Sequence, residues 1–110
     1  MKNSEFLRKA KALIDTPEKW TQGYFATDGG GIVVDPHTQH AQCFCSLGAL
    51  WRQEVAENST GMEFSSQVPV VYLNRAMDGD IPYFNDRHNH AEVIAAWDAA
   101  IAAAELDEAN

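Results

Sequence analysis

The C-terminal stretch from Asn89 onward constrains the fold more than any other part of the sequence. Asn89 precedes Glu92 by three residues, which is the spacing of a capping box with Asn as the cap. Apolar residues then recur at helical spacing, and the intervening alanines favour a helix and allow neighbouring elements to approach closely. The inward-facing set comprises Val93, Ile94, Trp97, Ala100, Ile101 and Ala104. The pattern predicts a long helix that runs to about Leu106.

Two earlier segments also show helical spacing of apolar residues. A helix that opens at Ser4 has the apolar residues Phe6, Leu7, Ala10, Leu13 and Ile14. A second helix is expected to begin between Thr38 and Cys43, with a face made of Phe44, Leu47, Gly48, Trp51 and Val55. A glycine at position 48 of this face costs about 1 kcal/mol relative to alanine. We therefore expect another element to cross close to the backbone there.

Two further segments have less regular patterns. Residues 68–73 are rich in β-branched side chains, which is typical of a strand. Ser65 or Ser66 as an N-cap and Pro69 in the first turn favour a helix instead, over about residues 66–77. Residues 81–86, "IPYFND", are interpreted as a short strand-like apolar segment that ends in an Asn-Asp turn.

A glycine-rich turn at residues 28–31 separates two short β-prone runs, residues 24–27 and 32–35. Glycines accept positive φ without steric cost, so this pattern predicts a two-stranded hairpin. A hairpin alone is only marginally stable and must pack against helices. The predicted fold class is mainly α (α+β), with about four helices and one small β-hairpin. We expect a compact single domain over residues 1–110, with a core over about residues 5–104 and a short acidic C-terminal tail.

The formal net charge is −8, from 16 acidic and 8 basic side chains. Nucleic-acid binding requires clustered Lys and Arg that displace counterions, so no direct nucleic-acid binding is expected. Residues 91–110 contain acidic side chains and no basic one. This end is either a solvated helix face or a docking surface for a protein partner with a basic surface. The predicted partner-binding residues are Asp98, Glu105, Asp107 and Glu108.

No apolar run in the sequence approaches the ~18 residues of a membrane span, and the N-terminal residues contain no continuous apolar signal-peptide core. The two cysteines, Cys43 and Cys45, are poorly placed to bridge each other. These features predict a cytoplasmic protein with reduced thiols and without a membrane partner.

Cys45 is the first candidate for catalytic chemistry. A helix N-terminus and a nearby imidazole would lower the pKa of its thiol and make it a nucleophile. A Cys-His-Asn/Asp set with His40, Asn85 and Asp86 would then give a hydrolase or transferase. The alternative is that Cys45 is a small buried apolar side chain. The sequence has no local signature of a cysteine hydrolase, which favours the packing alternative.

Four potential metal ligands lie close together in the sequence, namely His37, His40, Cys43 and Cys45. Structural zinc sites usually combine one close pair with a second pair well downstream, which differs from this arrangement. Helical side chains two residues apart point about 200° apart, so Cys43 and Cys45 could not both bind one ion if both are helical. We therefore expect no metal or other cofactor, with a small metal-binding domain as an alternative.

The Asn85-Asp86 pair follows the apolar segment at residues 81–84. Short polar side chains bond to backbone groups two residues on and stabilise tight turns, which is the structural interpretation. The functional alternative is a polar pair that is exposed on the same side of the molecule as Cys45.

Several short motifs together resemble a known family. They are Trp20, Gln22-Gly23, Ala26-x-Asp28, Cys45 with Gly48-Ala49-Leu50, Asn85-Asp86, Glu92-Val93 and Ala100-Ile101. Over residues 5–104 these motifs are similar to a family of small uncharacterised domains of bacteria and their phages, a domain of unknown function. The family has Arg-Thr after the Asn-Asp turn, whereas this chain has Arg87-His88. The resemblance implies one domain of prokaryotic or phage origin and no particular activity.

The small size and the asymmetric charge favour a binding function over an enzymatic one. We predict a small acidic protein-binding domain of prokaryotic or phage origin. In its most specific form it is an inhibitor that occludes a host nucleic-acid-handling defence protein. The alternatives are a Cys45-dependent hydrolase or transferase and a small metal-binding domain.

Overall fold

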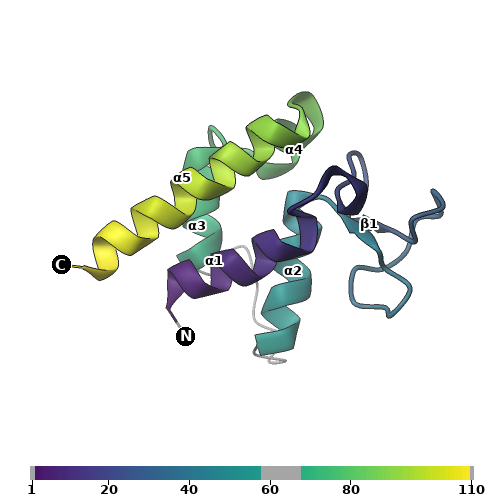
Figure 1. Cartoon of the computed structure of the whole chain (residues 1–110), viewed down its shortest axis with the longest axis horizontal. Helices are drawn as coiled ribbons and strands as arrows, with labels where there is room; N and C mark the ends of the chain where they lie inside the picture. The colour runs from purple at the N-terminus through teal and green to yellow at the C-terminus, as the bar shows by residue number, and fades with distance from the viewer. Residues whose placement is uncertain (1, 58–67, 110) are drawn as a thin grey trace.

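The computed structural model describes residues 2–57 and 68–109, so the caps predicted at Ser65 or Ser66 lie outside the described residues. Within this part the helices are α1 (Asn3–Lys11), α2 (Ser46–Glu57), α3 (Val68–Ala76), α4 (Ile81–Arg87) and α5 (His90–Glu108) (Figure 1). The shorter elements are the 3-10 turns η1 (Ala12–Ile14) and η2 (Pro17–Lys19) and the antiparallel strands β1 (Ala26–Thr27) and β2 (Cys43–Phe44). The mainly α class is confirmed, with five described helices where about four were expected.

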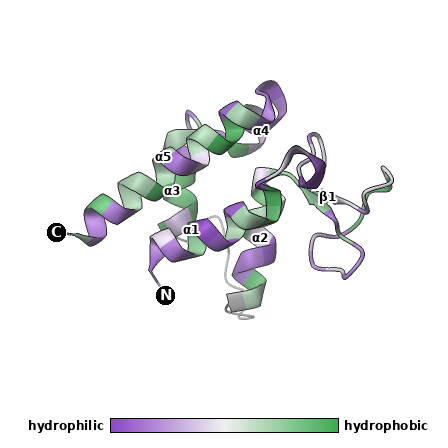
Figure 2. Cartoon of the chain, viewed as in Figure 1, coloured by the Kyte–Doolittle hydropathy of each residue, from purple (hydrophilic) through white to green (hydrophobic). Residues whose placement is uncertain are grey.

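α5 is the longest helix, and it packs against α1 and α3 (Figure 1). Its predicted capping box is present, because the Asn89 side chain accepts a hydrogen bond from the Glu92 amide and the Glu92 carboxylate accepts one from the Asn89 amide. The buried stripe comprises Val93, Ala96, Trp97, Ala100, Ile101 and Ala104. Figure 2 shows hydrophilic residues interspersed among hydrophobic ones along this helix, and its exposed positions include several alanines.

The reversal at residues 28–31 forms, but the predicted hairpin partner is largely wrong. The Asp28 amide donates to the Ile32 carbonyl and the Val34 amide to the Ala26 carbonyl, yet Thr27 and Val33 form only an isolated bridge. The two-stranded sheet instead pairs Ala26–Thr27 with Cys43–Phe44. This pairing buries Ala26 and Phe44 in the core, whereas the residues after the reversal are left at the surface.

α2 begins at Ser46, later than predicted, because the chain before it is extended. Phe44 was placed on the helix face and instead lies in β2, where its carbonyl accepts a hydrogen bond from the Thr21 amide. Cys45 occupies the N-cap position, since its carbonyl accepts the first helical hydrogen bond from Ala49. The close approach predicted at Gly48 is confirmed, because a Cβ there would lie 2.0 Å from the Phe25 carbonyl oxygen.

The segment at residues 81–86 was predicted to be strand-like and is helical instead. Asp80 caps α4, because its carboxylate accepts a hydrogen bond of 3.1 Å from the Tyr83 amide. Pro82 lies in the first turn, where a missing N–H leaves no helical hydrogen bond unmade. The helix predicted over about residues 66–77 is confirmed as α3 from Val68 onward. No helix in the described ranges combines the length and apolar character needed to cross a membrane.

Candidate functional site

Asn85 is completely buried and holds three separate segments of the chain together. Its side-chain oxygen accepts hydrogen bonds from the Trp20 indole (2.8 Å), the Ser46 amide (3.0 Å) and the Ser46 hydroxyl (2.8 Å). Its amide nitrogen donates to the Thr21 carbonyl and to the Asp86 carboxylate, both at 3.1 Å. These bonds join residues far apart in the sequence instead of closing the local turn that was expected.

Further hydrogen bonds extend this polar network in two directions. The Ser46 hydroxyl accepts a hydrogen bond of 3.0 Å from the Trp97 indole, which connects the start of α2 to the core of α5. The Gln22 side chain donates to the Asn85 and His88 carbonyls at the C-terminal end of α4. The network therefore fixes the position of α4 relative to the loop before β1. A satisfied buried network of this kind specifies one arrangement of its neighbours.

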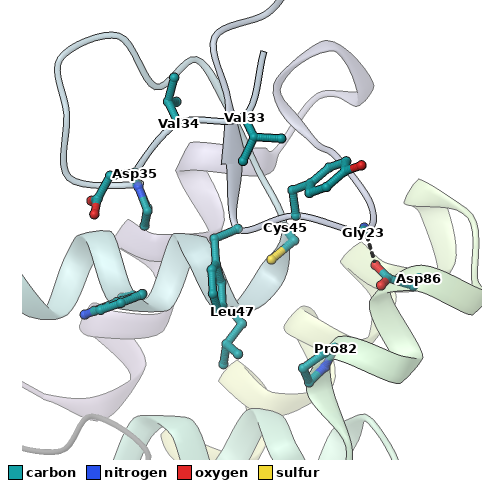
Figure 3. A pocket seen from close by; sticks show the side chains of 12 residues that line it. Gly23, Val33, Val34, Asp35, Cys45, Leu47, Pro82 and Asp86 are labelled. Atoms are coloured by element: carbon teal, nitrogen blue, oxygen red, sulfur yellow. Dashed lines mark hydrogen bonds between the residues drawn. The ribbon is translucent and has the colours of Figure 1, made fainter. Parts of the chain in front are cut away.

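The same network positions the carboxylate of Asp86. This carboxylate accepts a hydrogen bond of 2.9 Å from the Gly23 amide, as Figure 3 shows. Gly23 has a φ of 85°, a conformation that favours glycine. Asp86 is exposed and lines the same cavity as Cys45. The functional alternative placed both Asn85 and Asp86 on the exposed side with Cys45, but Asn85 is buried.

This cavity, which we call the main pocket, has a volume of about 730 Å³. Its walls come from residues 23–25, residues 33–36, the start of α2 and α4 (Figure 3). The apolar lining includes Tyr24, Phe25, Val33, Leu47, Trp51 and Pro82. Among the described lining residues, the charged side chains are Asp35 and Asp86. The volume and the apolar lining with a few polar groups are typical of binding sites.

Large apolar side chains of the main pocket remain exposed to solvent. Tyr24 is 55% exposed, Phe25 is 44% exposed and Val33 is 52% exposed. The Phe25 ring packs edge-on against Trp51, with the ring centroids 5.4 Å apart. Contiguous exposed apolar surface of this kind marks an interaction site more often than a structural one.

The Cys45 side chain is buried and forms part of the wall of the main pocket (Figure 3). Burial raises the pKa of this thiol, and the Asp86 carboxylate raises the pKa further, although the amides of Gly48 and Leu47 partly oppose the shift. A raised pKa favours the neutral thiol, which is the opposite of what nucleophilic catalysis needs. His40, the predicted imidazole partner, is exposed and is not among the described residues of the pocket wall.

The structure does not bring the predicted metal ligands together. The His37 ring nitrogens lie 3.0 Å from the Asp35 carboxylate and 3.3 Å from the Trp51 carbonyl oxygen. The Cys43 thiol donates to the Glu18 carbonyl. In the described ranges, no three His, Cys, Asp or Glu side chains are grouped as a metal site requires. The four predicted ligands, His37, His40, Cys43 and Cys45, therefore form no such group.

Two of the predicted partner-binding residues form ion pairs with α1. Asp98 pairs with Lys11 at 2.6 Å, and Glu105 pairs with Arg8. The side chains of Asp98 and Glu105 remain 56% and 51% exposed. They therefore connect α5 to α1 while staying accessible to solvent.

The other two predicted partner-binding residues bond at the end of α5. The Glu108 carboxylate accepts hydrogen bonds from the amide (3.0 Å) and hydroxyl (2.6 Å) of Ser4, and these bonds lower its pKa. The Asp107 carboxylate accepts a hydrogen bond from the Tyr72 hydroxyl, which raises the pKa of that tyrosine. All four carboxylates thus have partners within the chain, and their role in docking stays a prediction.

The aromatic residues of the main pocket were not predicted to form a site. Tyr24 and Phe25 were placed in a predicted strand, and Trp51 on the apolar face of a predicted helix. One signal in the sequence does point to them. Tyr24-Phe25 and Ile32-Val33 lie on opposite sides of the glycine reversal. Adjacent residues of an extended chain point to opposite faces, so a single core cannot cover all four side chains.

The fold and the site define a class: a small, mainly helical domain with a buried asparagine at its centre and an apolar, acidic-edged pocket beside it. The chain belongs to the family of unknown function DUF6197, which matches residues 1–103. This membership agrees with the resemblance to a domain of unknown function, while the bacterial or phage origin stays a prediction. No curated protein and no solved structure matches the chain.

Proposed function

We propose that this chain is a protein-binding domain and that the main pocket is its docking site. One observation supports the proposal above all others: the pocket leaves Tyr24, Phe25 and Val33 exposed around an apolar hollow. Aromatic residues are enriched in the cores of protein interfaces, where they contribute much of the binding energy. A partner side chain that fills the hollow would remove this apolar surface from water.

The charge of the pocket indicates the character of the partner. Asp35 and Asp86 are the charged residues of its described wall, and the whole chain has a net charge of −8. A partner with Lys or Arg beside the inserted apolar side chain would complement these carboxylates. The same charge would speed up association with a basic surface, and the effect would weaken as salt increases.

In its most specific form, the proposed partner is a host nucleic-acid-handling defence protein, which this domain would occlude and inhibit. Protein surfaces that bind nucleic-acid phosphates are rich in Lys and Arg. Such a surface would complement the two carboxylates of the main pocket. The acidic face of α5 is a second surface that such a partner could contact. We rank the pocket first because it combines two carboxylates with the exposed apolar side chains of Tyr24, Phe25 and Val33.

A site-specific crosslinking experiment tests this proposal. A photoreactive amino acid replaces Tyr24 at the pocket in one version of the full chain and Ala102, exposed on α5, in another. Any protein captured in cells from position 24 but not 102 is then purified. Its affinity is measured for the unmodified chain and for two variants, Val33→Lys and Ile32→Lys.

These two variants are matched, because Val33 and Ile32 are adjacent and both exposed, but only Val33 lines the pocket. We expect Val33→Lys to weaken binding at least about tenfold, and Ile32→Lys to leave the affinity within about twofold. Unchanged binding by Val33→Lys would refute the docking site. If binding fell only with Asp98→Asn and Glu105→Gln, the acidic face of α5 would be the interface instead.

A further inference from the structure

A second hollow adjoins the main pocket. It has a volume of about 250 Å³ and lies between α3 and the start of α4. We call this second hollow the side pocket. Leu47 and Pro82 line both hollows, so the two pockets share part of their walls. Val71 of α3 lines the side pocket and is 38% exposed, and the shared residue Pro82 is also exposed, so both pockets include apolar side chains open to solvent.

Both hollows have the same sign of charge. The side pocket includes Asp80, whose carboxylate caps α4, and the main pocket includes Asp86 in the last turn of the same helix. With a rise of about 1.5 Å per residue, these two positions lie about 9 Å apart along α4. Among the described residues that line the two hollows, none is Lys, Arg or His. Acidic groups therefore stand at both ends of α4, one in the wall of each pocket.

We propose that the partner of this domain presents a short linear segment, with one apolar side chain in each pocket and a Lys or Arg near Asp80 or Asp86. This inference rests on the proposed function and adds the form of the recognised element. A single segment is sufficient because the pockets are adjacent, with Leu47 and Pro82 in the walls of both. Neighbouring side chains on one face of a peptide are about 5–6 Å apart in a helix and about 7 Å apart in an extended chain, so one short segment can place a side chain in each of two adjacent pockets.

The first part of the test uses a displayed library of random peptides, each of about a dozen residues, selected on the full chain. Enriched peptides should contain two apolar residues within a few positions of each other and at least one Lys or Arg. One enriched peptide is then synthesised with a fluorescent label, and its affinity is measured by fluorescence anisotropy.

The second part uses matched variants against this labelled peptide. Val71→Lys blocks the side pocket, and Val68→Lys is its control, because Val68 is on the same helix and exposed but lines neither pocket. We expect Val71→Lys to reduce the affinity about tenfold or more and Val68→Lys to change it by less than about twofold.

The charge requirement is measured with Asp86→Asn, which keeps an oxygen to accept the hydrogen bond from the Gly23 amide while removing the charge. We expect an affinity loss of about three- to tenfold at low salt that shrinks at high salt. Enriched peptides without Lys or Arg, or full affinity with Val71→Lys, would overturn the inference.

The two proposals fail in different ways. If no peptide is enriched but Val33→Lys still disrupts binding of the crosslinked partner, the partner uses a folded surface, and only the linear-segment inference is lost. If Val33→Lys leaves that partner's binding unchanged, the docking site itself is wrong.

Discussion

The helical side of this molecule and its loop-rich side treat apolar surface differently. On the helical side, α1, α3 and α5 bury a continuous stripe that includes Trp97 and Ala100, and the carboxylates of α5 pair with neighbouring helices. On the loop-rich side, formed by residues 20–36 with the starts of α2 and α4, Tyr24 and Phe25 stay exposed around the main pocket. The first side buries most of its large apolar side chains, whereas the second leaves several of them exposed around the main pocket.

The two sides are also held together by different forces. Apolar contacts between long helices stabilise the helical side, and many side chains share that task. The loop-rich side depends on a few specific contacts, chiefly the hydrogen bonds of Asn85 and the close approach at Gly48. The hydrogen bonds of Asn85 join the chain at Trp20 and Thr21, the start of α2 and α4, and these segments lead into or carry walls of the main pocket.

The largest expected effect comes from removing the Asn85 side chain. Asn85→Ala leaves the Trp20 indole and the Ser46 amide without their acceptor in a buried site. Each orphaned buried group costs about 1–3 kcal/mol, so we expect a loss of about 3–5 kcal/mol in the free energy of unfolding, measured with urea. Asn89→Ala, which removes only the α5 cap, should cost about 1 kcal/mol. Equal losses for the two variants would show that the loop-rich side does not depend on Asn85.

A smaller but still large effect is expected at Gly48. Gly48→Ala places a Cβ 2.0 Å from the Phe25 carbonyl oxygen, a backbone atom just before β1 that also accepts a hydrogen bond from the Cys45 amide. We expect a loss of about 2–4 kcal/mol in the urea-measured free energy of unfolding. Gly30→Ala is the control, because its φ is not positive and its nearest neighbour is 3.4 Å away. If both variants were equally stable, the close approach would be unimportant.

The third comparison concerns the two thiols. Cys43 is half-buried and Cys45 is buried with a raised pKa, so iodoacetamide should modify Cys43 at least about tenfold faster at pH 8. The rates are measured on Cys45→Ser and Cys43→Ser, which leave one thiol each. The pH at which Cys45 becomes reactive should lie above that of a free cysteine. Rapid modification of Cys45 near neutral pH would instead support the hydrolase or transferase alternative.

The smallest expected effect is a loss of stability at acid pH, which comes from Glu108 on the helical side. Hydrogen bonds from Ser4 lower the pKa of Glu108 in the folded protein, so their stabilising contribution is present above the ordinary glutamate pKa of about 4.5. It is lost as the pH falls through the lower, folded-state pKa. Because Glu108 is exposed, we expect only a small decrease in the urea midpoint below about pH 4.5. Ser4→Ala should reduce this acid dependence, and an unchanged profile would contradict the assignment.

The sequence predicted the helical side well, because the signals there are local. The capping box from Asn89 to Glu92 spans four residues, and the buried stripe of α5 repeats at helical spacing from Val93 to Ala104. The close approach at Gly48 was also predicted, although its partner, the Phe25 carbonyl, was not. Nothing within the neighbourhood of residue 48 identifies a segment more than twenty residues away.

The sequence predicted the loop-rich side less well, because short elements give weak signals. α4 has only seven residues, and its apolar and aromatic residues are equally typical of a strand. Phe44 fits the helical face of α2, but pairing with Ala26 places it in a strand. The sequence could not predict the role of Asn85, because the groups that donate hydrogen bonds to it belong to Ser46 and Trp20. These residues are 39 and 65 positions away along the chain.

The amino-acid sequence by itself determined the mainly helical class, the caps and stripe of α5, the sharp reversal at the glycines and the excess of negative charge. Each of these follows from propensities and spacings within a few residues. The tertiary structure alone decided which strand pairs with β1, that Asn85 joins three segments, and that four separate pieces of chain enclose an apolar pocket. Those outcomes depend on contacts between residues distant in the sequence, where the best burial of apolar groups and pairing of polar ones overrides local preference.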